Sequence, residues 1–272
     1  SRIRRWLCKE DSETDESNTR LQDIKICPNC HEKLVYDFVR YHHIGFAHCP
    51  KCDFRNSEPN YQISKINTDE NTFTLDGKEY SCVKGSGIFN VYNVLSIVAV
   101  LRDMGISEED IIKSLKSLNI VETRFNELNI KGKNIVTTFL KGDNALSASR
   151  PFDFASKVGP KTNIVLVIDD QHEKVEHGMY EYMCFMYDSD YELLNNKNID
   201  RIIIGGVHSY DEKVRMLMAG IPEEKLFLCD NELDCNKYID YDNAENIVIL
   251  HDLYAIDIMR KLVDNIKEDL KW

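Results

Sequence analysis

Five short and almost wholly apolar segments recur through the second half of the sequence. They are NIVTTFL (134–140), NIVLVID (163–169), RIIIGG (201–206), KLFLCD (225–230) and NIVILHD (246–252). A strand that is apolar on both faces has to be buried on both faces, as happens in a parallel sheet covered by helices. The pattern therefore predicts a doubly wound α/β domain that begins at about residue 121.

The stretches between these segments have helical patterning, for example SYDEKVRMLMAG (209–220) and LYAIDIMRKLVDNIKEDL (253–270). Sheets of this kind bind ligands beyond the carboxyl ends of their strands. Asp169 and Asp170 end the second predicted strand, a common position for functional carboxylates.

The first half of the chain is organised differently, and we expect it to form a separate domain over residues 1–120. Residues 61–83 alternate as short strands, with a hairpin turn at Asp76-Gly77. Residues 89–105 form a strongly apolar helix, and the sequence SEED from Ser107 to Asp110 has the form of a capping box that starts a second helix.

Four of the nine cysteines form two C-x-x-C pairs, in ICPNC and HCPKC, and they are Cys27, Cys30, Cys49 and Cys52. This spacing is typical of a zinc ribbon, which we place at residues 24–56. Four thiolates close a tetrahedral zinc site and leave no position for water, so the predicted role is structural. Four unrelated buried thiols are the alternative. The nearby His31, His42, His43 and His48 could replace a ligand, but surface or packing roles suit them better.

The charge of the chain excludes some classes of function. Its formal net charge is −12, with 34 basic and 46 acidic residues, which argues against a general nucleic-acid binder. The other five cysteines are scattered, so a secreted disulfide framework is not expected. No apolar run reaches the roughly 18 residues of a membrane helix, and no signal-peptide pattern opens the chain, which predicts a cytoplasmic protein.

The cysteine ribbon and four further stretches, in a fixed order along the chain, resemble one ligase family. GIFNVYNVLSIVAVLRDMGI (87–106) resembles the segment that closes the ATP-binding central domain of Mur ligases. The cysteine ribbon just upstream of it resembles the MurT-like branch. MYDSDYELL (186–194), GGVHSYDEKVRMLMAGI (205–221) and LYAIDIMRKL (253–262) are similar to three further stretches of that branch.

The resemblance implies both a fold and an activity. The fold would be the C-terminal part of a Mur ligase central domain with an inserted zinc ribbon, followed by a doubly wound, Rossmann-like C-terminal domain. The activity would be an ATP- and Mg²⁺-dependent amidation of the D-glutamate α-carboxylate of lipid II through an acyl phosphate. A GatD-like glutamine amidotransferase subunit would supply ammonia from glutamine.

The same resemblance assigns four residues to nucleotide binding. Asn90 and Asn93 would place amides against adenine, although Asn also favours helix capping. Arg124 would contact phosphate or ribose, with a plain surface arginine as the alternative. Lys141, in FLKGDNALS, occupies the family's lysine position in an altered loop.

Asp188 is the predicted catalytic residue. In MurT-like proteins an aspartate of this domain is thought to orient the histidine of the partner's Cys–His pair. The resemblance aligns Asp188 with an aspartate that follows a tryptophan in the family. The family's preceding Asp-Gly-x-Asp-x-Ser-Trp sequence is not preserved here, and a cap in the acidic turn is the alternative role.

The chain departs from the family in one respect, because it has no G-x-x-x-x-G-K-[ST] phosphate loop. That loop lies upstream of the ribbon in the family. The sequence, which starts at Ser1, is therefore expected to be the C-terminal part of a longer protein or a degenerate homologue, and to be inactive on ATP by itself. A non-catalytic docking module for a glutaminase-like partner, or a Mur/folate-type ligase for another carboxylate, are the alternative functions.

Overall fold

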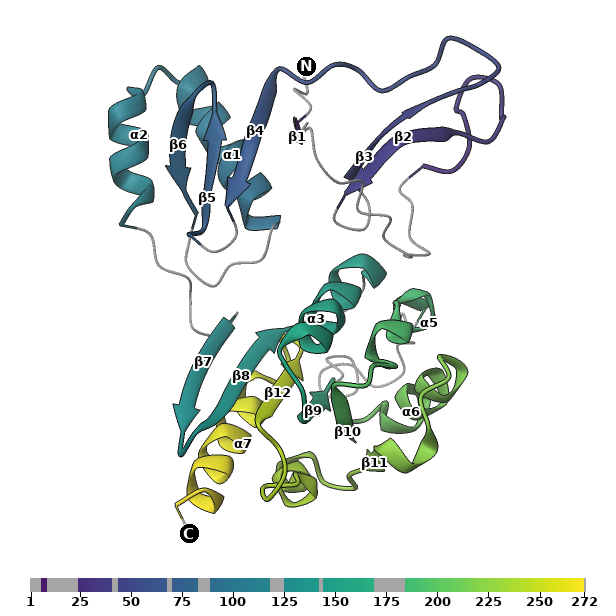
Figure 1. The fold of residues 1–272 in the computed structure, drawn as a ribbon. Coiled ribbons are helices and arrows are strands. Elements are labelled where there is room, and N and C mark those ends of the chain that lie inside the picture. Colours follow the sequence, from purple (N-terminus) through teal and green to yellow (C-terminus); the bar gives the residue numbers. More distant parts are fainter. Residues whose placement is uncertain are drawn as a thin grey trace. The chain divides into compact units, whose positions relative to one another are not determined.

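The computed structural model divides the chain into two compact units, residues 1–120 and residues 121–272 (Figure 1). It describes residues 6–8, 24–40, 44–67, 70–82, 89–117, 125–141, 144–168 and 184–271. Each unit is described by itself below.

The first unit is built on a four-stranded sheet with the order β1-β4-β5-β6. Its strands are β1 (Trp6–Cys8), β4 (Tyr61–Asn67), β5 (Thr72–Leu75) and β6 (Lys78–Ser81). β1 is parallel to β4, and the other pairs are antiparallel. Asp76 and Gly77 join β5 to β6 with φ angles of 51° and 75°, the two positive values that a tight hairpin turn requires. The predicted hairpin is confirmed.

Two helices pack on this sheet. α1 (Phe89–Asp103) buries Leu95 and Val98 against Phe73 and Tyr80 of the strands. α2 (Glu108–Leu115) starts where the capping sequence predicted, because the Ser107 side chain accepts a hydrogen bond from the Asp110 backbone N–H.

A small two-stranded sheet interrupts the first unit. β2 (Val35–Arg40) and β3 (Ile44–His48) are antiparallel and lie in sequence between β1 and β4. Because β1 and β4 are direct neighbours in the larger sheet, the segment between them is an insertion that leaves the sheet and returns to it. This arrangement agrees with the prediction of an inserted ribbon.

The second unit contains a six-stranded sheet with the order β11-β10-β9-β12-β8-β7. The strands are β7 (Phe125–Ile130), β8 (Lys133–Phe139), β9 (Thr162–Val167), β10 (Ile199–Gly205), β11 (Leu226–Leu228) and β12 (Asn246–His251). The five apolar segments are confirmed as parallel strands. The antiparallel edge strand β7 was missed, because FNELNI mixes polar and apolar residues as an edge strand with one exposed face does.

Helices cover both faces of this sheet, as a doubly wound domain requires (Figure 1). One face carries α3 (Ala145–Lys157), α5 (Cys184–Asp188), the short helix η1 (Tyr191–Leu194) and α6 (Ser209–Met218). The opposite face carries η3 (Glu232–Tyr238) and α7 (Ile256–Asp269). A further short helix, η2 (Glu223–Lys225), precedes β11.

The strand order creates a switch point between β9 and β12. The next described helix after β9, α5, packs on one face, and α7, which follows β12, packs on the other face. Neighbouring strands whose following segments leave toward opposite faces open a crevice at their carboxyl ends, where ligands of α/β sheets bind. The topology therefore marks this edge as the ligand-binding edge of the unit.

A polar network ties the two helices of the first unit to its hairpin. The Arg102 guanidinium is 2.6 Å from the Asp76 carboxylate and 2.7 Å from the Tyr80 hydroxyl, and it also contacts the Glu108 carboxylate. Hydrogen bonds from Lys78 and Tyr80 lower the pKa of Glu108 to about 2, from an ordinary value of 4.5, although partial burial opposes them.

This network predicts an acid-dependent loss of stability. A folded-state pKa below the unfolded value stabilises the protein above about pH 4.5, and the contribution disappears as the pH falls toward about 2. We expect Glu108→Gln to cost about 1–2 kcal/mol at neutral pH and almost nothing near pH 2. Urea unfolding across this range measures both values. Glu109→Gln, an exposed neighbour in the same turn, is the control, and an equal loss in both variants would contradict the prediction.

Candidate functional site

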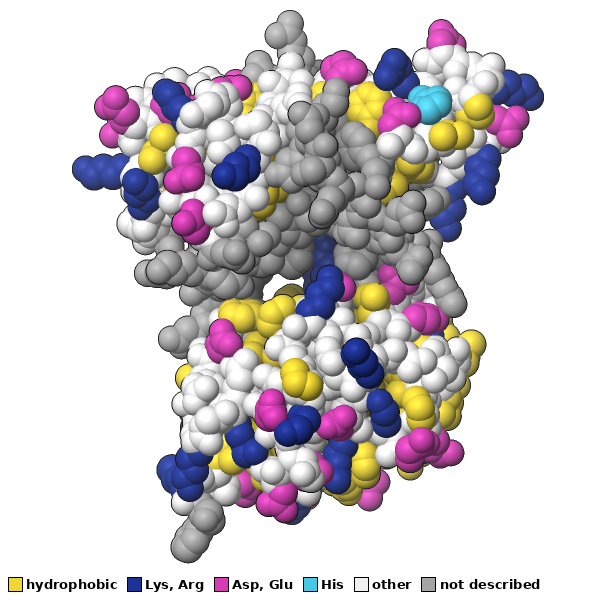
Figure 2. Space-filling model, in the orientation of Figure 1, with side chains coloured by type: hydrophobic (Ala, Val, Ile, Leu, Met, Phe, Trp, Pro, Cys, Tyr) yellow, Lys and Arg dark blue, Asp and Glu magenta, His cyan; other side chains and the backbone are white. Residues whose placement is uncertain are grey.

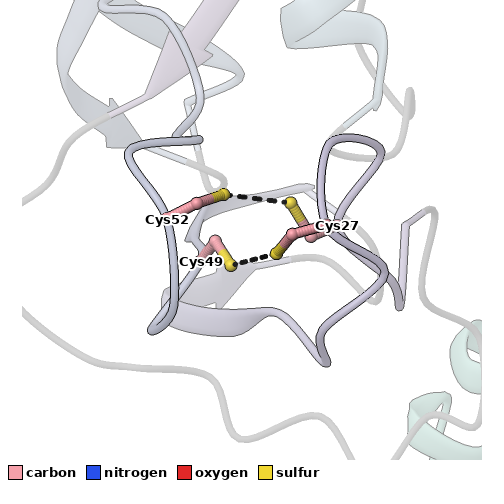
Figure 3. A group of neighbouring side chains, drawn as sticks. Cys27, Cys49 and Cys52 are labelled. Carbon is pink, nitrogen blue, oxygen red and sulfur yellow. Dashed lines mark hydrogen bonds between the residues drawn. The ribbon is translucent and has the colours of Figure 1, made fainter.

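The four knuckle cysteines come together in the structure (Figure 3). Their sulfur atoms all lie within 4.8 Å of one another, with 3.6 Å between Cys27 and Cys52 and 3.4 Å between Cys30 and Cys49. A zinc ion with Zn–S bonds of about 2.3 Å holds its tetrahedral sulfurs about 3.8 Å apart. The cluster therefore has the size and the donor set of a four-thiolate zinc site.

The knuckle backbone favours a thiolate at Cys49, whereas at Cys52 a backbone hydrogen bond is outweighed by burial and the neighbouring sulfurs, which raise the pKa to about 12. The N–H of Lys51 donates to the Cys49 sulfur at 3.4 Å. Burial raises the pKa of Cys49, but hydrogen bonds from the backbone N–H groups of Lys51 and Cys52 outweigh it and bring the pKa to about 7. The other knuckle closes through a hydrogen bond from the His31 N–H to the Cys27 carbonyl, with His31 at a φ of 61°. Both turns aim their sulfurs at one point.

Histidines stand apart from the cluster in the described part of the ribbon. The four cysteines alone make up the candidate metal-binding group among the described residues. His31 is exposed, and the His48 Nδ1 atom is paired with the Asp37 carboxylate at 2.9 Å. His42 and His43 lie outside the described residues.

Asp188 is the last residue of α5, and its side chain is exposed although the turn that follows is buried. The Ser189 hydroxyl donates to the Phe185 carbonyl at 2.6 Å, and the Asp190 N–H donates to the Ser149 hydroxyl at 2.8 Å. The Ser189 hydroxyl also lies 3.3 Å from the carbonyl of Ala145, the first residue of α3. Because α3 follows β8, the Asp188 turn lies at the carboxyl edge of the sheet.

Lys141 lies at the same edge, exposed, two residues beyond the end of β8. The adjacent strand β12 ends there in His251, which is fully buried. The His251 Nδ1 atom is 2.9 Å from the Asp252 carbonyl, so this nitrogen carries the proton. The Nε2 atom is buried and has no hydrogen-bond partner among the described residues, and burial lowers the His251 pKa. His251 is thus a buried histidine with only one of its two ring nitrogens paired within the described part of the chain.

Asn90 and Asn93 lie together in the first turn of α1. The Asn93 amide donates to the Asn90 side-chain oxygen at 3.2 Å. Because α1 starts at Phe89, Asn90 lies inside the helix and not at its N-cap. The two amides thus form one small polar group at the start of a largely apolar helix. Arg124, Asp169 and Asp170 lie outside the described residues.

Sequence reasoning did not single out three buried polar residues beneath the Asp188 turn. They are Tyr191, Glu212 and Arg215, and each is at most 3% exposed. Tyr191 donates a hydrogen bond to the Glu212 carboxylate, and burial raises the Glu212 pKa to about 8. Helical spacing could have revealed them, since Glu212 and Arg215 share the buried stripe of α6 with Met216.

The surface and the helices limit what the chain can contact directly. Figure 2 shows basic and acidic side chains interspersed over both units on the face in view. Mixed charge of this kind is unlike the clustered Lys and Arg that bind a phosphate backbone. Among the described residues, no helix combines the length and the apolar character that crossing a membrane requires.

Comparison with known proteins shows what the second unit is similar to. Residues 143–256 match the family model of the MurT ligase C-terminal domain. The subunit MurT of the glutamine-hydrolyzing lipid II isoglutaminyl synthase of Staphylococcus aureus (strain COL) is 25% identical over 201 residues, which cover 74% of this chain and 44% of that protein. The corresponding Streptococcus pneumoniae (strain ATCC BAA-255 / R6) subunit is 24% identical over 249 residues, with coverages of 88% and 52%. The chain thus spans about half the length of these relatives.

Solved structures share the fold. A pseudomurein peptide ligase type C from Methanothermus fervidus superposes with a TM-score of 0.62 at 17% identity, over 96% of this chain and 52% of that one. The ligase MurC from Thermotoga maritima gives a TM-score of 0.57 at 15% identity, over 79% and 47%. The resemblance to MurT-like Mur ligases and the predicted fold class are confirmed.

The cysteine cluster predicts about one bound zinc ion per chain. Replacing Cys49 and Cys52 together by serine should reduce the zinc content to near zero and unfold the ribbon, because structural zinc contributes folding free energy directly. Metal analysis after exhaustive dialysis, with hydrogen exchange of the β2 and β3 amides, measures both effects. Cys184→Ser, an exposed cysteine of the second unit, is the control. Unchanged exchange protection in the double variant would refute a structural metal.

Proposed function

We propose that this chain, whose residues 143–256 match the MurT ligase C-terminal domain, is part of a ligase that amidates the D-glutamate α-carboxylate of lipid II to D-isoglutamine. The order of its motifs and the named function of its curated relatives support this proposal. Residues 1–120 would supply the end of the central domain with its ribbon, and residues 121–272 the C-terminal domain. The protein would act with a GatD-like glutaminase subunit.

The proposed reaction has two chemical steps. A carboxylate oxygen of the substrate attacks the γ-phosphorus of ATP, and the bond from that phosphorus to the β,γ-bridging oxygen breaks to give an acyl phosphate and ADP. The nitrogen of ammonia then attacks the acyl carbon, the C–O bond to phosphate breaks, and the nitrogen loses a proton as the amide forms. Catalysis of both steps depends on positioning and on charge stabilisation.

Four residues are the candidates for nucleotide contact, namely Asn90, Asn93, Arg124 and Lys141. An amide donates and accepts at once, which suits the paired donor and acceptor atoms of adenine, and Asn90 and Asn93 hold two such amides side by side. Lys141 presents a point charge at the carboxyl edge of the sheet, where phosphates bind in α/β domains. Arg124 would add a guanidinium fork for phosphate or ribose. Mg²⁺ would supply charge neutralisation between the phosphates.

The proposal for Asp188 rests on the difference between its exposed side chain and the buried residues that follow it. An exposed carboxylate stands on a turn whose neighbouring residues Ser189 and Asp190 are buried and hydrogen-bonded. A carboxylate that orients a histidine on another subunit needs access to solvent before assembly and a fixed position after it. The exposure of Asp188 supports the first requirement, and the hydrogen-bonded turn beside it supports the second. The ribbon, by contrast, would serve only as a structural staple.

A substitution at Asp188 separates glutamine hydrolysis from the amidation step. In the complete protein with its glutaminase subunit, we expect Asp188→Asn to lower glutamine-dependent amidation by about 10⁴-fold, because the partner histidine loses its orienting carboxylate. Amidation driven by added ammonium should persist, since ammonia bypasses the glutaminase. Product formation from lipid II with each nitrogen source measures the ratio.

Asp264→Asn is the matched control, since Asp264 is also exposed but belongs to α7 on the opposite face of the sheet. If Asp188→Asn leaves the glutamine-driven rate intact, Asp188 does not have this role. If the unmodified complete protein amidates nothing with either nitrogen source and binds no ATP, the chain is instead a docking module. Amidation of a different carboxylate would identify another ligase of the same fold.

The second prediction concerns the asparagine pair. Asn93→Ala should weaken ATP binding by the complete protein about tenfold, the cost of one hydrogen bond to the base. Isothermal titration measures the affinity, and the melting temperature should change little. Ser96→Ala is the control, because Ser96 lies one turn further along α1 and its hydroxyl bonds only to the Tyr92 carbonyl. A lower melting temperature with unchanged ATP affinity would indicate a helix-stabilising role instead.

A further inference from the structure

Arg215 is the most deeply buried of the described cations that sit beside a candidate functional residue. It lies on α6, and its side chain is 3% exposed. A guanidinium keeps its charge in any protein environment, so burial on this scale requires hydrogen-bond acceptors on several sides. Within the described part of the chain, the acceptors of Arg215 belong to one short segment, residues 187–192.

Two of these acceptors are backbone carbonyls on either side of Asp188. The Arg215 Nε atom donates to the Tyr187 carbonyl at 3.2 Å, and an Nη atom donates to the Ser189 carbonyl at 2.8 Å. The peptide units that precede and follow Asp188 are thereby held by one rigid, planar group. Since the direction of a side chain follows from its backbone, this clamp sets the direction in which the Asp188 carboxylate leaves the turn.

The Arg215 guanidinium is itself held in place by the Glu192 carboxylate and by the buried hydrogen bond between Tyr191 and Glu212. The same Nη atom lies 3.1 Å and 2.9 Å from the two oxygens of Glu192. The Tyr191 ring lies 5.2 Å from the guanidinium carbon, and its hydroxyl is bonded to Glu212, one turn before Arg215 on α6. Arg215 is therefore fixed to both α6 and the turn, so the clamp moves only if the helix moves.

Capping the end of α5 is the ordinary explanation for such contacts, because arginines commonly bind the last carbonyls of a helix. It accounts for the contact with Tyr187. It does not explain why Arg215 also binds the Ser189 carbonyl, on the far side of Asp188. Nor does it explain why Tyr191, Glu212 and Arg215 are all buried beneath an exposed carboxylate. The arrangement is that of a supporting layer under a functional group, which has to be held to within a fraction of an ångström.

We propose that Arg215 is the positioning residue for Asp188, holding its carboxylate at the angle from which it orients the histidine of the glutaminase subunit. This inference rests on the proposed function of Asp188. Arg215 itself touches neither glutamine nor the partner's catalytic pair. It acts through the backbone on both sides of Asp188.

The test compares two conservative arginine variants in the complete protein assembled with its glutaminase subunit. Arg215→Lys keeps the charge but cannot bridge the two carbonyls. Arg201→Lys is the matched control, because Arg201 also holds a carbonyl and a carboxylate, those of Tyr238 and Asp240, away from Asp188. Both variants lose one guanidinium clamp in the same unit.

At saturating glutaminase subunit, we expect Arg215→Lys to lower the kcat of glutamine hydrolysis about 100-fold, the effect of a misplaced catalytic group. Loss of the nearby carboxylate also lowers the pKa of the partner histidine, so the limb of the pH–rate profile that reports this histidine should move to lower pH. Ammonium-driven amidation and the melting temperature should match those of Arg201→Lys. A purely structural role would lower stability or subunit affinity and leave the pH profile in place.

Three outcomes decide the matter. A pH limb and a kcat that match those of Arg201→Lys would overturn the inference. If Asp188→Asn is itself fully active, the proposed function of Asp188 fails, whatever Arg215 does. If Arg215→Lys does not fold, Tyr191→Phe replaces it, because that change keeps the ring against the guanidinium and removes only the bond to Glu212. We then expect a smaller loss, about tenfold, with a shift in the same direction, and no shift would overturn the inference.

Discussion

Burial of the parallel sheet on both faces is the constraint on which the second unit depends. Ile164, Val165 and Leu166 of β9 are at most 1% exposed, and they alternate between the two hydrophobic cores. An unpaired polar group is costly on either face. Chemistry is therefore confined to the edges of the sheet, and the carboxyl edge collects Lys141 and the Asp188 turn.

The ribbon obeys a different constraint, because it is too small to hold itself together with apolar contacts. Its buried cluster consists of Cys27, Leu34, Ala47 and Cys49. Two of these four residues are knuckle cysteines, so the core and the candidate metal site share residues. A unit of this kind folds when a metal replaces the missing hydrophobic core. It can be inserted between β1 and β4 because both of its ends return to neighbouring strands.

The fold was largely predictable from the sequence, since its determinants are local and repeated. The five apolar strands, the Asp76-Gly77 turn and the Ser107 cap each follow from residue types at fixed spacing. The edge strand β7 was not predictable in this way, because its pairing with β8 depends on a neighbour and not on its own pattern. Most of the candidate site residues were assigned by resemblance, and the structure supplies their surroundings.

The supporting layer under Asp188 shows why such surroundings escape sequence reasoning. Charged residues on a helix usually face solvent, so Glu212 and Arg215 read as part of an ordinary polar face. Their positions contradict that reading, since they lie three residues apart on the stripe that also buries Met216. A charge on an apolar stripe has to be paired inside the protein. Its partner cannot be read from the helix, because Glu192 and the carbonyls around Asp188 come from a different element. Only the fold brings the two together, and the buried cluster beneath Asp188 is therefore visible in three dimensions alone.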